Sequence, residues 1–277
     1  DRGGCAAAMH STAQWASHPQ GKAIANEPLI AWETHDSIAP TQLNNLNGVR
    51  VLDLTRILAG PVATRLLAGF GAEVLRIDPL DWDEPAAAPE VTLGKRCAGL
   101  DLRSQAGRAT FKELLAQADV LVHGYRADAL DALGLGPEVR RALNPHCIDV
   151  SLNAYGWSGP WTNRRGFDSL VQMSSGIAAA GMHAAQSEIP VPLPVQALDH
   201  ATGYLMAAAV LRGLRLRARL GQVMSARLSL ARTANLLIDA GVQNTHDNLA
   251  PETSSDLKTT VEQTATGLLK HLNRERM

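Results

Sequence analysis

Among the side chains that could do chemistry, one carboxylate stands in an unusual setting. Asp168 follows a loop rich in Gly, Pro and Arg, and it begins an apolar segment. Arg164 and Arg165 put two cations close to it, and Gly166 would let a bulky ligand approach the backbone. A carboxylate with an ordinary pKa of about 3.9 is a nucleophile at neutral pH without a partner base. Asp is also a favoured N-cap residue, so this pattern leaves two roles open, nucleophile and helix cap.

The cysteines do not indicate a competing site. The chain has three, Cys5, Cys97 and Cys147, at wide spacing and with no C-x-x-C pair. This usage argues against a disulfide framework or a zinc site, so no metal site is predicted, and it fits a reducing cytoplasm. His146 precedes Cys147, but both begin an expected strand, where neighbouring side chains point to opposite faces. A Cys–His nucleophile is therefore disfavoured.

Composition excludes several classes of partner. The 277 residues allow one large domain or two small ones, enough for a sizeable core. Lys plus Arg (26) nearly balances Asp plus Glu (27), so we expect no general attraction to nucleic acid or anionic membranes. The longest apolar run, residues 201–211, is far shorter than the ~20 residues of a membrane span. No basic and then apolar leader opens the chain, so we expect a cytoplasmic protein without a signal peptide.

The elements that must hold Asp168 alternate between short apolar runs and helical spacing. Strands are predicted at residues 49–55, 73–77, 120–122 and 148–151, and helices at 62–70, 104–115 and 127–142. This order predicts an α/β fold in which a parallel sheet carries helices on both faces. Beyond the loop, a long helix at 200–220 and a strand at 224–230 are expected.

The two ends of the chain differ from this middle. Residues 1–45 are polar and interrupted by prolines, so they are expected to be an extended linker or tail. Residues 46–243 form the expected main domain. Residues 244–277 are expected to be a polar tail, either weakly amphipathic helix or disorder.

Two known motifs are absent, although the expected strands and helices would provide a place for them. The turn after Asp53 reads LTRILAGP and lacks G-x-G-x-x-G, so no dinucleotide cradle is predicted, although Asp78 ends the second strand. The sequence GWSGP has Pro160 in place of the second glycine of a nucleophile elbow.

Four stretches, in order along the chain, carry a resemblance to a known family. They are LNGVRVLDLTRILAGPVATRLLAGFGAEVLRIDP (46–79), GKRCAGLDLRSQAGR (94–108), ADVLVHGYRADALDALGLG (118–136) and SLNAYGWSGPWTNRRGFDSLVQMSSG (151–176). They resemble the family III CoA-transferases, also called the CaiB/BaiF family, and the last is similar to the loop that carries the catalytic aspartate. The resemblance covers roughly residues 46–238.

The resemblance implies a Rossmann-like α/β domain, an incomplete second domain, and two chains interlocked as a homodimer. It implies an enzyme that moves CoA from an acyl-CoA thioester to a carboxylic acid through an aspartyl anhydride and thioester. Asp168 is then the catalytic nucleophile, and coenzyme A is bound as the acyl-CoA substrate. The implied CoA contacts are Arg56, Ala59, Gly60, Lys95, Arg96, Gly124, Tyr125 and Arg126, and Tyr155 is implied to line the thioester pocket.

Departures from the family pattern keep other functions open. GYRAD at 124–128 stands where the family has E-N-F-R-P-G, and the stretch GLGPEVRRA lacks the histidine of the racemase branch, which disfavours an acyl-CoA racemase or isomerase. The family's long C-terminal half is absent, and residues 13–30 look like the tail of a preceding family domain. The chain therefore resembles the second half of a longer, duplicated member. A non-catalytic CoA-binding or structural half, which needs a partner family III subunit, is the main alternative.

Overall fold

The structure is a computed structural model that describes residues 4–40, 42–126, 128–241, 253–264 and 267–272. The chain divides into two compact units, Asp1–Ala240 and Gly241–Met277.

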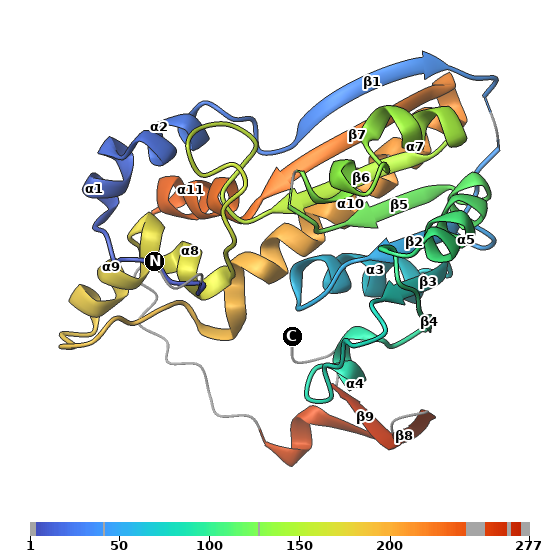
Figure 1. The fold of residues 1–277 in the computed structure, drawn as a ribbon. Helices are drawn as coiled ribbons and strands as arrows, with labels where there is room; N and C mark the ends of the chain where they lie inside the picture. The colour runs from blue at the N-terminus through green and yellow to red at the C-terminus, as the bar shows by residue number, and fades with distance from the viewer. Residues whose placement is uncertain (1–3, 41, 127, 242–252, 265–266, 273–277) are drawn as a thin grey trace. The chain divides into compact units, whose positions relative to one another are not determined.

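Figure 1 shows a seven-stranded sheet at the centre of the first unit. The strands are β1 (Ala31–Ser37), β2 (Arg50–Leu54), β3 (Glu73–Asp78), β4 (Lys95–Gly99), β5 (Val120–His123), β6 (Ile148–Asn153) and β7 (Gln222–Ser229). Their order is β1-β7-β6-β5-β2-β3-β4, and every neighbouring pair is parallel except β1 with β7. The predicted parallel sheet is confirmed, with one antiparallel edge strand added.

Helices connect these strands. They are α1 (Thr12–Ser17), α2 (Pro19–Ala25), α3 (Ala59–Gly69), α4 (Ala88–Val91), α5 (Gln105–Ala116), α6 (Ala129–Ala132), α7 (Pro137–Leu143), α8 (Asp168–Ser175), α9 (Ile177–Ala184), η1 (Pro194–Gln196), α10 (Ala197–Leu220) and α11 (Leu230–Ala240). Of these, α3, α5 and α10 lie where the spacing of apolar residues predicted helices. Ser104 caps α5, since its Oγ accepts a hydrogen bond from the Gly107 N–H at 2.9 Å. The helix expected at 127–142 is split into α6 and α7, and its residue 127 lies outside the described residues.

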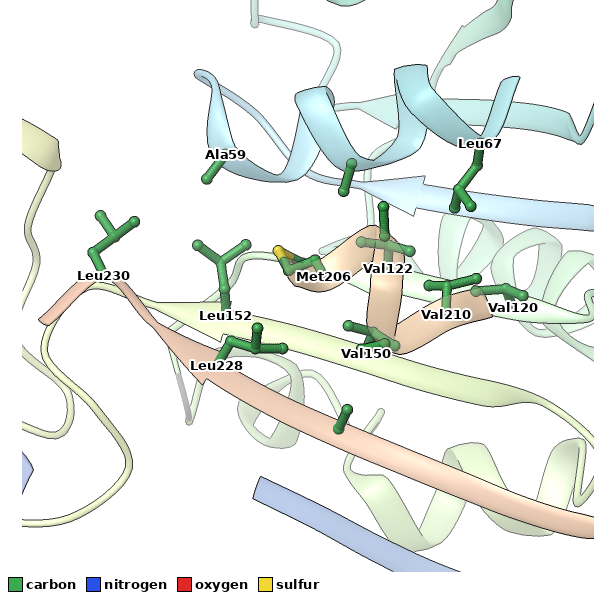
Figure 2. Close-up of a cluster of buried hydrophobic side chains, with 14 of the residues drawn as sticks. Ala59, Leu67, Val120, Val122, Val150, Leu152, Met206, Val210, Leu228 and Leu230 are labelled. Atoms are coloured by element: carbon green, nitrogen blue, oxygen red, sulfur yellow. The ribbon is translucent and has the colours of Figure 1, made fainter. Parts of the chain in front are cut away.

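The face of the sheet that carries α3 and α10 holds the larger core. Alternate residues of each strand point to this face, because side chains alternate across a strand. Figure 2 shows Val120 and Val122 of β5 among these side chains, together with Leu67 of α3 and with Met206 and Val210 of α10. Burial of an aliphatic side chain of this size contributes roughly 1.5–3 kcal/mol, so this face fixes the position of α10 on the sheet.

The opposite face carries α5, α6 and α7. Leu52, Leu54 and Leu121 point to this side and pack in one cluster with Phe111 and Leu115 of α5. The predicted arrangement of helices on both faces is therefore confirmed.

The direction in which strands are added reverses between β2 and β5. From β2 the chain adds β3 and β4 on one side, and it then returns to add β5, β6 and β7 on the other. In open parallel sheets a crevice forms at the carboxyl ends of the strands at such a reversal, and ligands bind there.

Residues 12–37 differ from the expected extended tail. They form α1, α2 and β1, and Trp15 and Ile24 are buried in the main core. Pro19 does not break this segment, because it occupies the first position of α2, where its missing N–H costs nothing. Figure 1 shows α1 and α2 beside α8, α9 and α11 at one end of the sheet.

The described part of the second unit holds η2 (Ser254–Asp256) and an antiparallel pair, β8 (Leu257–Thr264) and β9 (Gly267–Leu272). Helix or disorder was expected for 244–277, but the β-branched residues of LKTTVEQT favour a strand. Residues 242–252, 265–266 and 273–277 lie outside the described residues.

Among the described residues, no helix combines the length and the apolar character needed to cross a membrane. No three or more of the described His, Cys, Asp and Glu residues come together in a way that could hold a metal ion.

Candidate active site

A cavity of about 610 Å³ lies at the carboxyl ends of β2, β5 and β6, next to the strand reversal. Its wall begins where each strand ends, with Thr55 after β2, Gly124 after β5 and Ala154 after β6. Arginines from three segments line it: Arg56, Arg126, Arg164 and Arg165. The cavity thus occupies the position at which parallel α/β sheets bind ligands, and its cations suit an anionic ligand.

The turn between β2 and α3 forms one side of the cavity. The Arg56 guanidinium lies over the rings of Trp82, at 4.7 Å, and Tyr125, at 5.3 Å. The next residue, Ile57, has a φ of 70°, a left-handed conformation that is strained for a β-branched side chain. Its N–H donates to Glu84 Oε1 at 2.8 Å. Strain of this kind is concentrated at functional sites.

The start of α3 lies on the same wall. Ala59 and Gly60 line the cavity in the first turn of α3. A Cβ on Gly60 would lie 2.3 Å from the Thr55 side chain, so only glycine lets this turn pack against the end of β2. The structure therefore brings six of the eight expected CoA contacts together at one cavity: Arg56, Ala59, Gly60, Gly124, Tyr125 and Arg126.

Lys95 and Arg96 lie apart from this cavity. The Lys95 side chain is 0% exposed, and its ammonium group donates to Asp53 Oδ2 at 3.0 Å and to Thr64 Oγ1 at 2.6 Å. Burial lowers the pKa of Lys95, against the opposing charge of Asp53. The Arg96 side chain is 76% exposed and lies 3.9 Å from Glu73. The structure thus pairs Lys95 with Asp53 in the interior and leaves Arg96 outside the cavity wall, so it does not bring these two expected CoA contacts to the cavity.

Asp168 is the first residue of α8 and is 1% exposed. Its Oδ2 accepts hydrogen bonds from the N–H groups of Leu198, at 2.8 Å, and Asp199, at 3.0 Å. Its Oδ1 accepts from Gln172 Nε2 at 2.5 Å. The carboxylate therefore caps the amino end of α10 and not its own helix. It lies behind the cavity wall, to which its neighbour Phe167 and its partner Asp199 belong.

Asp199 is a site residue that the sequence did not reveal. It is the third residue of α10, it is 6% exposed, and it lines the cavity. Burial, and then the charge of Asp168, raise the pKa of its carboxyl group to about 7. The predicted helix began at residue 200, which left Asp199 just before it. Acidic residues are common at the start of a helix, so the sequence offered no reason to assign Asp199 to the site.

Tyr155 and Gly166 pack beside the loop that precedes Asp168. The Tyr155 hydroxyl pairs with Ser174 Oγ at 3.0 Å, and its ring meets Trp161 edge-on at 5.0 Å. Tyr155 is buried and does not line the cavity, unlike the expectation. A Cβ on Gly166 would lie 2.7 Å from the side chains of both Ala154 and Tyr155. This glycine is thus required for packing between the loop and the end of β6.

The segment expected to be a tail holds the loop in place. The side chain of Gln20, which is 0% exposed, donates to the carbonyls of Tyr155 and Ser158, at 2.8 Å each. Its Oε1 accepts from the N–H of Trp161 at 2.7 Å. Glu27 accepts from two further N–H groups of the loop, at 2.8 Å each. No local signal could have shown these bonds, since they join residues more than 100 positions apart.

Cys147 is unsuited to act as a nucleophile. Burial raises the pKa of its thiol, and its Sγ lies 3.7 Å from the carbonyl of Ile148. A thiol held in its neutral form is a poor nucleophile, so Cys147, which directly precedes β6, is not a competing nucleophile.

Comparison with protein families matches residues 46–264 to CoA-transferase family III. Succinyl-CoA:glutarate CoA-transferase of Mus musculus is 36% identical over 202 residues, which cover 68% of this chain and 44% of that protein. The alpha subunit of succinyl-CoA–L-malate CoA-transferase of Chloroflexus aurantiacus is 31% identical over 220 residues, which cover 74% and 50%. The chain therefore spans about half the length of these curated relatives.

Solved structures show the same likeness. The crystal structure of the Mycobacterium tuberculosis protein Rv3272 is similar with a TM-score of 0.62 and 32% identity, covering 70% of this chain and 57% of that one. A CaiB/BaiF family protein of Brucella suis has a TM-score of 0.62 and 25% identity, covering 81% and 65%.

Proposed function

Since this chain belongs to CoA-transferase family III, we propose that it takes part in moving CoA from an acyl-CoA thioester to a carboxylic acid. The observation that carries the proposal is the meeting of an arginine-lined cavity with the buried carboxylate of Asp168 at the strand reversal. A CoA thioester offers phosphates to the arginines and a carbonyl carbon to a carboxylate nucleophile.

In the proposed reaction Asp168 is the nucleophile. One of its oxygens attacks the carbonyl carbon of the acyl-CoA, the C–S bond breaks, and CoA leaves as a thiolate from a mixed anhydride. The thiolate then attacks the aspartyl carbonyl of the anhydride, which releases the donor carboxylate and leaves an aspartyl-CoA thioester. The acceptor carboxylate attacks the carbonyl carbon of this thioester, which releases the CoA thiolate and leaves an anhydride between Asp168 and the acceptor. The thiolate then attacks the acceptor's carbonyl carbon in this anhydride, which forms the acceptor's CoA thioester and frees the Asp168 carboxylate. No partner base is needed, because every attacking group is already an anion.

The surroundings of Asp168 support this role. Three donors hold its carboxylate oxygens in fixed directions, two of them from the amino end of the 24-residue α10. Such donors stabilise a negative charge and orient it. Because Asp168 is 1% exposed and does not line the cavity, the proposal requires the cavity wall to move when the thioester binds.

The cations of the cavity are assigned to the phosphates of CoA. Arg56 and Arg126 lie on the two turns that follow β2 and β5, on either side of the strand reversal. A guanidinium group pairs with a phosphate through two parallel hydrogen bonds, and the stack on Trp82 and Tyr125 would hold Arg56 ready to do so.

We also propose that the active form is a dimer or a complex of two subunits. One of the similar proteins is by name an alpha subunit, which favours an active form with a second subunit. The two candidate forms are an interlocked homodimer and a complex with a partner family III subunit. Light scattering of the purified chain should then report a dimer or a complex, and a monodisperse monomer that is active would contradict this part.

A ligand titration tests the proposed function. Calorimetry with CoA and succinyl-CoA should show binding, and succinyl-CoA with glutarate or malate should give the acceptor's CoA thioester. Arg56→Ala should weaken binding roughly tenfold or more, through loss of a charge-assisted contact. Arg103→Ala is the control, because Arg103 is exposed and lies outside the cavity. The absence of heat and of any thermal shift at millimolar ligand would sink the proposal.

One observation favours a second candidate, a non-catalytic CoA-binding half. Asp168 is 1% exposed and serves as the cap of α10, which is a sufficient structural reason for an aspartate there. Transfer by Asp168→Asn, measured with a partner present, separates the two candidates. A complex in which the other subunit does the chemistry keeps its wild-type rate without the Asp168 carboxylate.

A further inference from the structure

Asp199 puts a second carboxyl group beside Asp168 at the amino end of α10. Its own N–H donates to Asp168 Oδ2 at 3.0 Å, so the two residues are joined directly. Asp199 lines the cavity, whereas Asp168 lies behind the cavity wall. A group bound in the cavity therefore contacts Asp199 before Asp168.

Asp199 differs from Asp53 and Asp149, which are each paired with a cation. Asp53 lies 3.0 Å from Lys95, and Asp149 lies 2.7 Å from Arg140. Across the part of the chain that the structure describes, no hydrogen bond or ion pair reaches the Asp199 carboxyl oxygens. An uncompensated buried carboxylate is costly, and the neutral acid avoids that cost. Burial and the neighbouring Asp168 raise the pKa of Asp199 to about 7.

None of the charged groups that share the cavity with Asp199 forms an ion pair with it among the described residues. Arg56 is stacked on Trp82 and Tyr125. Arg164 lies 4.0 Å from the centre of the Trp161 ring and donates to the carbonyl of Ala6. Arg126 and Arg165 line the cavity without an ion pair to Asp199 among the described residues. The charge that acts on Asp199 is therefore that of Asp168.

We propose that Asp199 is a further catalytic residue, which in its protonated form donates its O–H to an oxygen of the acyl group or of the acceptor carboxylate in the cavity. This inference rests on the proposed function, because it assigns an acyl or acid oxygen as the ligand. Asp168 remains the anion that attacks, and Asp199 supplies the donor on the cavity side. The proton stays on Asp199 throughout, so the atoms and electrons of the transfer steps balance as before.

Asp199 is useful as a neutral acid because the reaction brings several negative charges close together. The acceptor is a carboxylate, the nucleophile is a carboxylate, and the tetrahedral intermediate carries an oxyanion. A neutral Asp199 offers a hydrogen bond to these oxygens, whereas an ionised Asp199 repels them. The expected consequence is weaker binding of the acceptor once Asp199 ionises.

Three variants separate these states. Asp199→Asn keeps a side-chain donor of similar size and cannot ionise, and Asp199→Ala has no donor. Asp239→Asn changes an exposed acid of α11 and is the control. We expect the KM for the acceptor to rise roughly tenfold between about pH 6 and about pH 8 in the wild type and the control, with a smaller change in kcat. It should stay flat in Asp199→Asn and be high at every pH in Asp199→Ala.

Thermal unfolding adds a readout that needs no turnover. Asp199 ionises at about pH 4 in the unfolded chain and only near pH 7 in the fold. As the pH rises from about 4 to about 7, the Tm of the wild type should therefore fall relative to the Tm of Asp199→Asn. Above about pH 7 the difference between the two Tm values should stay constant. A Tm difference that is the same at every pH overturns the inference. So does an acceptor KM in Asp199→Asn that keeps the wild-type pH dependence. A pH-dependent Tm difference without any transfer, even with a partner present, contradicts the proposed function and the catalytic role that rests on it, but leaves the neutral Asp199 established.

Discussion

The carboxylate of Asp168 accepts a hydrogen bond from the main-chain N–H of Leu198, 2.8 Å away and 30 positions further along the chain. Asp168, the first residue of α8, thereby caps the amino end of α10. The two roles left open by the sequence, nucleophile and helix cap, are compatible in this geometry, because the cap is made to a different helix. The donors that stabilise α10 are the same donors that would orient a nucleophile.

Asp168→Ala should therefore destabilise the fold as well as abolish any chemistry. It leaves two N–H groups of α10 and the Gln172 amide without their acceptor, and we expect a loss of roughly 1–3 kcal/mol in the free energy of unfolding. Urea unfolding measures it, with Asp239→Ala as the exposed control. An unchanged midpoint for Asp168→Ala would show that the cap contributes nothing.

Gln20→Ala should loosen the loop that precedes Asp168. The variant removes three hydrogen bonds, to Tyr155, Ser158 and Trp161, which we expect to cost roughly 2–4 kcal/mol. Hydrogen exchange should become faster across residues 156–165. Lys22→Ala, on the exposed side of the same helix, should leave exchange unchanged. Equal protection of the loop in both variants would show that the N-terminal segment does not hold it.

Lys95→Met should unfold the protein more easily while leaving CoA affinity intact in the folded molecules. The change leaves Asp53 as a buried charge without its cation, and breaking such a pair costs roughly 3–5 kcal/mol. Adding Asp53→Asn should recover part of the loss, because it removes the stranded charge. Arg96→Met, the exposed neighbour on β4, is the control. A selective fall in CoA affinity without a stability change would instead return Lys95 to the ligand site.

Part of this fold could be read from local patterns and part could not. The strands β2, β5 and β6 were predictable because they are buried on both faces, which leaves short, continuous apolar runs. Pro19 misled the prediction for the N-terminal segment, because a proline at the first helical position looks in sequence like a helix breaker.

The site shows the same division. Arg56, Gly60 and Tyr125 lie where two parallel strands end, so the strand prediction and the family resemblance together place them near one another. The positions of Lys95 and Asp199 in the fold could not be predicted from the local sequence. Lys95 faces inward because of the pairing of β4 with β3, and Asp199 lies in the cavity because α10 begins three residues before its predicted start.

Acid stability should depend on Asp149. Burial alone would raise the pKa of its carboxyl group, but His123 and Arg140 outweigh burial and lower the pKa to about 2. Its ordinary pKa is about 3.9, so its contribution to stability is present above about pH 4 and is lost as the pH falls toward about 2. Unfolding free energies measured over this range should fall more steeply for the wild type than for Asp149→Asn. Parallel curves for the two proteins would contradict the assignment.

The most direct test of the central claim is chemical trapping of the acyl enzyme. The chain, with its partner if one is needed, is incubated with succinyl-CoA, quenched with hydroxylamine and digested for peptide mass spectrometry. The account predicts a hydroxamate on Asp168 in the wild type, and none in Asp168→Asn, which keeps the side-chain size and still binds CoA. Transfer that proceeds with no hydroxamate on Asp168, or at the wild-type rate in Asp168→Asn, would contradict it.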